Sequence, residues 1–425
     1  MVAVAAVAAM AVASGTLPEA TASTAAAIPN AHPAAQAPAA QVPAVRVPAA
    51  QVPAVRVPAV QVPVVRVPAA HTSAAQTSAV VAPAAVVNAS APTSGGWALR
   101  PTGTDARFRG LAVVSRRTAW LAGTEGTVLR TRDGGATWRN VSPPGADELE
   151  FRDVEAFDGR RAVVLAIGEG EASRIFRTED GGSTWTESFR NTDPRAFYDC
   201  MAFFDPRHGL AVSDPVDGKY RVLATGDGGR NWRVLPSTGM PAAQPGEASF
   251  AASGQCLVTA RSSAQGRSGG GRDVWLATGG AAAARVLHSA DRGRTWTATA
   301  TPLPAGDPAR GVFGLAFRDR AHGLAVGGDY RPGEPSPEAA AVTGDAGATW
   351  RTASTPPPAY RSGVAWLPYS RRAALAVGPT GTDLTTDGGR TWRTLDPGSY
   401  DTVSCTPDLA CWAAGEHGRA AIRRG

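Results

Sequence analysis

Acidic, arginine and tyrosine side chains gather in a few loop-like segments of this 425-residue sequence. The candidate binding residues are Asp214, Asp217, Glu247, Arg285, Asp329 and Tyr330. The arginine could hold a carboxylate or a phosphate through paired hydrogen bonds, and the tyrosine could stack on a sugar or another ring. The alternative is structural, because side chains of these types also cap turns and pair with one another across loops.

The same segments raise the question of catalysis. A glycoside hydrolase needs two carboxyl groups flanking the bond that it cleaves, and Asp214, Glu247 and Asp329 could supply them. A sialidase would also need an arginine triad and a tyrosine nucleophile; arginines and tyrosines are present, but the sequence has no FRIP-like opening strand. No dinucleotide fingerprint or phosphate-binding loop is recognisable. We therefore expect a binding protein without a catalytic residue, a metal or a cofactor, and we keep a sialidase- or xyloglucanase-like hydrolase as the alternative.

A second set of aspartates recurs along the chain in the pattern S/T-x-D-x-G-x-x-W. Its members are Asp133, Asp180, Asp227, Asp291, Asp345 and Asp387, and 42 to 64 residues separate consecutive copies. The carboxylate can accept backbone N–H bonds across a tight turn, the hydroxyl can reinforce that turn, and the glycine permits a positive φ. The tryptophan begins the next strand and packs between neighbouring sheets. We interpret these Asp boxes as hairpin staples rather than catalytic groups.

Three apolar runs precede each box, for example residues 109–115, 118–123 and 127–131, and a fourth run begins at the tryptophan. Repeats of this length with strand-like flanks are typical of propeller blades. The last unit, 399–424, has three runs only, and residues 95–100 resemble the missing fourth. The sequence thus predicts an all-β, seven-bladed β-propeller of four-stranded antiparallel blades, with the ring closed by the N-terminal strand.

Strand direction in such blades assigns the candidate residues to one face. The turns between third and fourth strands carry the Asp boxes, and they share a face with the turns between first and second strands. The remaining loops lie on the opposite face and contain the candidate binding residues. A rigid scaffold with variable loops favours a binding site there, and makes the Asp-box face the less promising one.

The first 95 residues differ in composition from the rest. Residues 1–22 join an apolar run to small residues, as in a signal peptide or a weak anchor, and 23–95 form an Ala/Pro/Val-rich linker. That linker contains three decapeptide repeats (41–70), is expected to be disordered, and is either a stalk or an insert without a role. We expect a secreted or extracytoplasmic monomer, either free or attached to the cell surface, whose propeller spans 96–425. Membrane contact is expected only through an uncleaved N-terminal segment.

The net charge of +6 comes from arginines spread along the repeats, so nucleic acid is not an expected partner. Export favours disulfides among the four cysteines. We predict a bridge between Cys405 and Cys411, which flank a short turn in the last blade. Cys200 and Cys256, in adjacent blades, could pair or stay buried and free.

Four segments resemble a known family: FYDCMAFFDPRHGLAVSDPVDGKY (197–220), GEASFAASG (246–254), ARVLHSADRGRTW (284–296) and FRDRAHGLAVGGDY (317–330). With the boxes, they are similar to the BNR/Asp-box superfamily. More narrowly, residues 97–425 resemble the photosystem II stability/assembly factor family and its relatives in non-photosynthetic bacteria. The resemblance implies an exported, non-enzymatic binding or assembly protein with a protein or cell-surface glycan partner. Sialidases, xyloglucanases and sortilin-type receptors share the motif, so it specifies the fold much more closely than the function.

Overall fold

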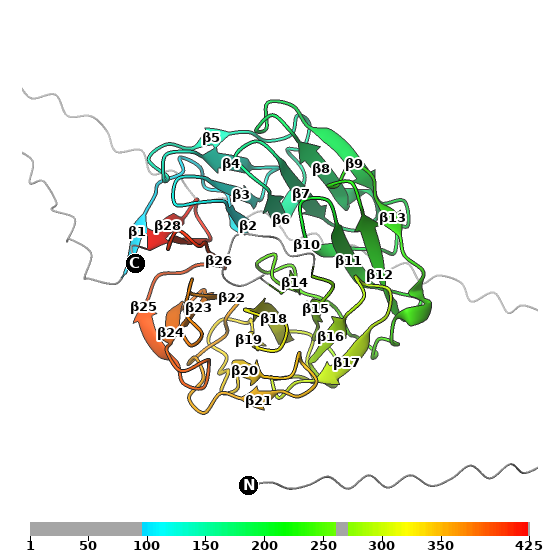
Figure 1. Ribbon diagram of the computed structural model, residues 1–425, viewed down its shortest axis with the longest axis vertical. Coiled ribbons are helices and arrows are strands. Elements are labelled where there is room, and N and C mark those ends of the chain that lie inside the picture. Colours follow the sequence, from blue (N-terminus) through cyan, green and yellow to red (C-terminus); the bar gives the residue numbers. More distant parts are fainter. Residues whose placement is uncertain (1–95, 261–270, 424–425) are drawn as a thin grey trace, which may run out of the picture. The chain divides into compact units, whose positions relative to one another are not determined.

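The computed structural model describes residues 96–260 and 271–423, which form seven four-stranded sheets arranged in a ring (Figure 1). This confirms the predicted seven-bladed propeller. The predicted signal segment, 1–22, and linker, 23–95, lie outside the described residues.

Each blade contains four antiparallel strands in chain order from the channel outward. Blade one is β2 (Phe108–Val113), β3 (Ala119–Gly123), β4 (Val128–Thr131) and β5 (Arg139–Asn140); blade two is β6 (Glu150–Ala156), β7 (Ala162–Ile167), β8 (Arg174–Thr178) and β9 (Thr186–Arg190). Blade three is β10 (Tyr198–Phe203), β11 (Gly209–Val216), β12 (Lys219–Thr225) and β13 (Arg233–Val234); blade four is β14 (Leu257–Thr259), β15 (Val274–Ala277), β16 (Arg285–Ser289) and β17 (Thr297–Ala300). Blade five is β18 (Arg310–Phe317), β19 (Gly323–Asp329), β20 (Ala340–Thr343) and β21 (Arg351–Thr352); blade six is β22 (Gly363–Trp366), β23 (Ala374–Gly378), β24 (Gly381–Thr385) and β25 (Arg393–Asp396). Blade seven is β26 (Thr402–Cys405), β27 (Cys411–Ala414), β28 (Ala420–Arg423) and β1 (Trp97–Leu99), and two short 3₁₀ turns cover Gly170–Ala172 and Ser237–Gly239.

The hydrophobic core lies between blades. In one cluster, Trp120 and Val128 of blade one pack with Phe151 and Val164 of blade two. The box tryptophans extend these contacts, since the ring of Trp185 meets that of Trp120 edge-on at 6.4 Å. Each sheet therefore buries both faces against its neighbours, which explains why the middle strands are apolar along their whole length.

Each of the six Asp boxes connects two turns of its own blade by hydrogen bonds. In blade one, Asp133 accepts the backbone N–H of Thr137 at 2.9 Å and its hydroxyl at 2.6 Å, while Thr131 donates to the same carboxylate at 2.8 Å. The N–H of Gly134 then donates to the carbonyl of Arg117, in the turn between the first two strands, at 2.9 Å. The other five boxes make equivalent bonds, so both kinds of turn lie on one face, as predicted.

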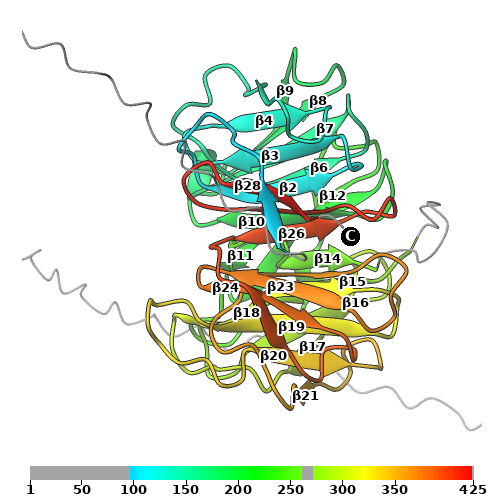
Figure 2. The same ribbon diagram turned by 90° about the vertical axis from the view of Figure 1, so that its left-hand side faces the viewer.

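The N-terminal strand closes the ring. Trp97, Ala98 and Leu99 of β1 pair antiparallel with β28, the last strand of the chain. The ring of Trp97 is buried, lies 5.4 Å from that of Tyr400, and its Nε1 donates to Thr382 Oγ1 of blade six at 2.9 Å. Figure 2 shows the red strands of blade seven beside the cyan strands of blade one, where the two ends of the chain meet.

Two disulfides are present. Cys405 pairs with Cys411 across the first turn of blade seven, as predicted. Cys200 of β10 pairs with Cys256, next to β14, which resolves the alternative that the sequence left open and ties blades three and four together beside the channel.

The closing strand yields a stability prediction. Trp97→Ala should lower the free energy of unfolding by about 3–5 kcal/mol, because it removes a buried indole and leaves Thr382 without its partner. Urea unfolding followed by fluorescence measures the change. Leu99→Ala is the control, since Leu99 is 58% exposed on the same strand. Equal effects of the two substitutions would show that β1 does not hold the ring closed.

Candidate functional site

A cavity of about 990 Å³ opens on the face opposite the Asp boxes. Its walls are the beginnings of the inner strands and the loops that follow the second and fourth strands. These are the loops in which the sequence placed the candidate binding residues, and Asp214, Asp329 and Tyr330 do line the cavity.

β-Bulges aim side chains into this cavity. In the inner strands of four blades the pairing register shifts by one residue near the beginning of the strand. The extra residues are Arg109 in blade one, Arg152 in blade two, Asp199 in blade three and Phe313 in blade five, and all four line the cavity. Because a bulge turns one side chain out of the pleat, the repeat places one variable residue per blade at the mouth of the channel.

Three arginines form the basic side of the cavity. Arg107 donates from Nε to Asp401 of blade seven at 2.7 Å, and Arg152 donates from Nε to Glu150 at 2.7 Å. Arg109 lies between them with weaker partners, since its nitrogens are 4.0 Å from Asp401 and 3.9 Å from Glu150. The buried Nε of Arg109 has no hydrogen-bond partner within the described residues. One guanidinium is therefore available to an anionic or carbonyl ligand.

The electrostatic state of Arg109 supports this interpretation. Burial lowers its pKa to about 10, and repulsion from Arg152 adds to that effect, while Asp401 opposes it. The group is still charged at neutral pH, but it lacks the full hydration or pairing that a buried cation requires. A ligand that supplied a carboxylate would relieve this cost.

Aromatic rings form the other side of the cavity. Phe250 and Phe313 stack with ring centroids 4.0 Å apart, and Phe313 meets Tyr330 and Tyr360 edge-on at 6.0 and 4.8 Å. Tyr330 is 51% exposed at the rim. The cavity thus combines an apolar wall with a cationic one.

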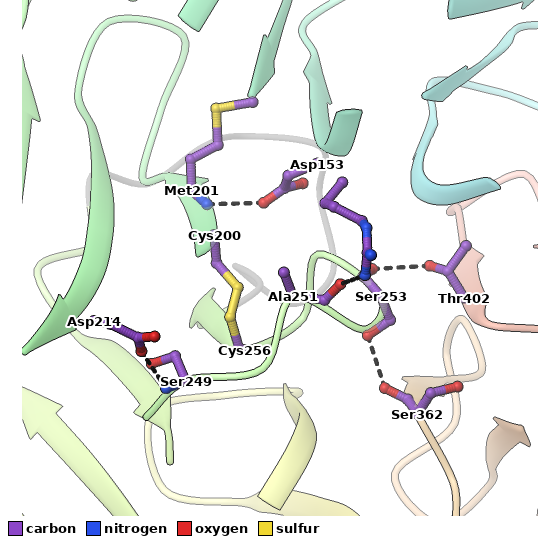
Figure 3. The surroundings of a disulfide bond; sticks show 11 residues. Asp153, Cys200, Met201, Asp214, Ser249, Ala251, Ser253, Cys256, Ser362 and Thr402 are labelled. Carbon is purple, nitrogen blue, oxygen red and sulfur yellow. Dashed lines mark hydrogen bonds between the residues drawn. A yellow bond between two sulfur atoms is a disulfide. The ribbon is translucent and has the colours of Figure 1, made fainter. Parts of the chain in front are cut away.

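A segment of blade four, residues 249–255, crosses the central channel (Figure 3). We call it the plug. Ser249 to Ala252 line the large cavity, and Ser253 to Gln255 line a second cavity of about 260 Å³ toward the Asp-box face. The plug therefore separates the two cavities and gives the larger one a floor.

Hydrogen bonds fix the plug to distant blades. Ser253 Oγ donates to the carbonyl of Ser362 in blade six at 2.7 Å, and Thr402 Oγ1 of blade seven donates to the Ser253 carbonyl at 3.1 Å. Gln255 Nε2 donates to the Val403 carbonyl at 2.7 Å. The Cys200–Cys256 disulfide anchors its end. These bonds make the floor a rigid part of the ring.

Two buried carboxyl groups, Asp199 and Asp214, lie next to the plug. Burial raises the pKa of Asp214 to about 6, and burial together with the nearby Asp214 carboxylate raises that of Asp199 well above its usual range. The backbone N–H of Ser249 donates to Asp214 at 2.7 Å. Asp199 Oδ2, Ser249 Oγ and Tyr220 OH are buried and find no hydrogen-bond partner among residues 96–260 and 271–423. The pair therefore holds a proton at mildly acidic pH.

The structure does not bring all the candidate residues together. Arg285 binds Glu247 through two hydrogen bonds, one of them from Nε at 2.8 Å, and Thr278 donates to the same carboxylate at 2.6 Å. Neither residue lines the cavity. Asp217 sits in the tight turn between β11 and β12 and pairs with Arg195 at 2.7 Å, also away from the cavity. These three match the structural alternative that the sequence left open.

Asp329 and Tyr330 reach the cavity in different states. Asp329 accepts hydrogen bonds from Arg331 Nε at 2.9 Å and Arg310 Nε at 3.0 Å. The bonds from Arg331 hold the pKa of Asp329 far below its ordinary value. Its carboxylate is thus committed to these arginines, whereas the Tyr330 ring is free to contact a ligand.

The arginine side of the cavity was not predicted, because Arg109 and Arg152 fall within runs that the sequence marks as inner strands. A signal was present: Phe108-Arg109, Phe151-Arg152 and Tyr198-Asp199 each put a charged residue after an aromatic one where the strand begins. Tyr400-Asp401 has the same order in blade seven. A charge at this point of a buried strand indicates a bulge.

The ring and its six Asp boxes define the chain as a BNR-type β-propeller. The family model described as "Photosynthesis system II assembly factor YCF48" matches residues 89–195. The predicted resemblance to these assembly factors is thereby confirmed. No curated protein matches the chain.

Solved structures show the same fold. A structure of YCF48 bound to a D1 peptide has a TM-score of 0.54 at 15% identity, covering 77% of this chain and 97% of that one. YCF48 from Cyanidioschyzon merolae has a TM-score of 0.55 at 16% identity, covering 77% and 98%. A xyloglucanase from Xanthomonas campestris has a TM-score of 0.47 at 16% identity, covering 72% of this chain and 50% of that one. Across 96–260 and 271–423, no helix has the length and hydropathy needed to span a membrane.

The raised pKa of Asp214 predicts a pH dependence of stability. Between about pH 4, the usual pKa of an aspartate, and pH 6, the folded state binds more protons than the unfolded state, so stability should fall as pH rises. Asp214→Asn should reduce this slope. Urea unfolding at several pH values tests it, with the exposed Asp217→Asn as control. A slope that persists in Asp214→Asn and vanishes in the control would contradict the assignment.

Proposed function

We propose that this chain is an exported, non-enzymatic propeller that binds a segment of a protein partner in the plugged cavity. The observation that carries the proposal is Arg109, a desolvated guanidinium whose Nε lacks a partner and which faces an open cavity. The printed description of one structural neighbour, YCF48 bound to a D1 peptide, supports a protein as the partner.

The chemistry of the cavity suits an extended peptide. The stacked Phe250 and Phe313 offer apolar surface to side chains, while Arg109 can bind a carboxylate by paired hydrogen bonds. The plug limits how far a ligand can enter, so a chain segment would bind at the mouth rather than thread through the ring. A cell-surface glycan is the second ligand class, and the exposed ring of Tyr330 would be its stacking surface.

The hydrolase alternative stays a prediction that the arrangement of carboxylates does not favour. Glu247 is held by Arg285 and Asp329 by Arg310 and Arg331, so neither is free to exchange a proton with a substrate. Asp214 has the raised pKa of an acid, but Asp401, a carboxylate that lines the cavity from blade seven, is held by Arg107.

A photocrosslinking experiment tests partner binding. A photoreactive phenylalanine in place of Tyr330 should capture a protein from the cell-envelope fraction of the native host, because this ring lies exposed at the cavity rim. The matched control is the same substitution at Tyr369, which is 74% exposed in the first turn of blade six on the Asp-box face. Crosslinks are identified by mass spectrometry. Equal capture from both positions would argue against a partner in the cavity.

A second variant tests the role of the arginine. Arg109→Gln, combined with the crosslinker at position 330, should reduce capture about tenfold, since a charge-assisted pair is lost. The fold should be kept, because Arg109 makes no short ion pair. Unchanged capture in a variant with an unchanged melting temperature would remove Arg109 from the site.

Export is the other part of the proposal and rests on residues 1–22. The protein from the culture medium or envelope of the native host should lack its first residues, since small side chains at 20–22 suit cleavage. Intact mass spectrometry measures this. Recovery of the whole chain from the cytosol alone would contradict export.

A further inference from the structure

A third cavity, of about 790 Å³, lies on the Asp-box face at the junction of blades five and six. Its lining includes the box aspartates Asp345 and Asp387, together with five arginines. These are Arg318 and Arg351 of blade five and Arg371, Arg372 and Arg390 of blade six. The cavity uses none of the residues of the proposed peptide site.

Four of these arginines have no acidic partner. Arg351, Arg371, Arg372 and Arg390 are exposed, and within the described part of the chain none of their guanidinium groups donates a hydrogen bond or forms an ion pair. Arg318 differs, since it pairs with Asp319 at 3.1 Å and stacks over the buried Trp366. The two box aspartates form no ion pair with the four in the described part of the chain, and their oxygens accept the hydrogen bonds of their own turns.

Another junction of the ring shows how an arginine at this position can be neutralised. At the junction of blades two and three, Arg230 occupies the same box position as Arg390, and it pairs with Glu179 of the preceding blade. The residue equivalent to Glu179 in blade five is Gly344, directly before its box aspartate. The arginine is thus present at both junctions, but only Arg230 has a glutamate to pair with. Glu179 is the one acid at this position among the six boxes. Arg294 of blade four is in the same situation as Arg390, since the preceding blade has Gly226 at that position.

The first turn of blade six, which adjoins the cavity, also lacks the aspartate found in several other blades. In blades two, three and five an aspartate accepts the backbone N–H bonds of the first turn, as Asp158 does at 2.7 and 2.8 Å. In blade six Ser370 accepts the equivalent bonds, at 3.1 and 2.8 Å. The turn is therefore built without a carboxylate, beside Arg371 and Arg372.

We propose that this cavity binds a polyanion of linked phosphate groups. Guanidinium groups bind phosphate oxygens through pairs of parallel hydrogen bonds, and four of them spread around one cavity match several phosphates better than one carboxylate. The only aromatic rings of the lining are His322 and Trp366, and the indole is 6% exposed, so a nucleobase would find no broad face to stack on. The phosphates could be joined as anhydrides or as diesters of a polyol.

Isothermal titration calorimetry with sodium tripolyphosphate, which measures the affinity and the number of sites, tests the proposal. The full chain should bind it at one site, with an affinity that falls as salt is added. Arg390→Gln should weaken binding about tenfold, the loss of one charge-assisted contact. The matched control is Arg230→Gln, at the same box position but paired with Glu179, which should bind as the wild type does. Equal weakening by both variants, or no binding by the wild type, would overturn the proposal.

Gly344→Glu introduces an acid at the position that Glu179 holds in blade two, and it should weaken binding as much as Arg390→Gln. It should fold normally, since a Cβ at Gly344 meets no atom within 4 Å and its φ lies outside the positive region. Unchanged melting temperatures in both variants separate a lost site from a damaged fold. A poly(glycerol phosphate) oligomer tests whether diester-linked phosphates bind as well as anhydrides. Tighter binding of an oligoglutamate or an oligonucleotide of equal charge would overturn the phosphate assignment.

A failure here leaves the peptide site unaffected. The variants lie on the Asp-box face, so they should not change photocrosslinking from position 330, and Arg109→Gln should not change tripolyphosphate binding. The two sets of measurements therefore fail or succeed separately.

Discussion

Pairing between the two ends of the chain is the interaction on which the ring depends. A sheet inside a propeller buries both faces against its neighbours, so a blade that lacks its outer strand exposes an edge and weakens two interfaces. Here Trp97 joins two blades: its strand pairs with blade seven, its ring packs on Tyr400 between blades six and seven, and its indole N–H reaches Thr382 of blade six. The closure therefore determines whether the inner strands meet around one channel, and so whether the cavity exists at all.

The cavity arises from departures from the repeat. A regular inner strand would alternate its side chains between the two neighbouring blades. The bulges free one residue per blade from that alternation, and this places Arg109, Arg152, Asp199 and Phe313 around the mouth of the channel. The plug is the second departure: it bonds to blades six and seven across the ring and gives the cavity a floor. Both features leave the outer strands and the staples unchanged, so a binding site can be altered without loss of the fold.

The fold followed from the sequence because its determinants are local and repeated. Each box fixes its own turn through contacts within about five residues, so the pattern specifies the hairpin wherever it occurs. The Cys405–Cys411 bridge could be predicted for the same reason. The site is different, because its members come from five or more blades and meet only after closure. Loop composition located Asp214 and Tyr330, but it could not tell that Arg285 faces Glu247, or that Arg109 leaves its strand, since both depend on register and on distant neighbours.

The Asp boxes identify the fold, and the sequence marks their face as the less promising one for a ligand, since every box carboxylate accepts hydrogen bonds from its own turn. Because these carboxylates are used in the same way in each box, the other charged residues on this face can be compared between blades. Each of the six boxes makes the same hydrogen bonds, so differences in charge between the blade junctions come from the residues around the boxes. At the junction of blades two and three Arg230 meets Glu179, and at that of blades five and six Arg390 meets Gly344. The hydrogen bonds of the box do not need a glutamate beside them, and without one Arg390 forms no ion pair within the described residues. Because the hydrogen bonds of each box are complete without the surrounding charged residues, those residues can differ from junction to junction. A junction with several unpaired arginines is then a candidate site for an anionic ligand.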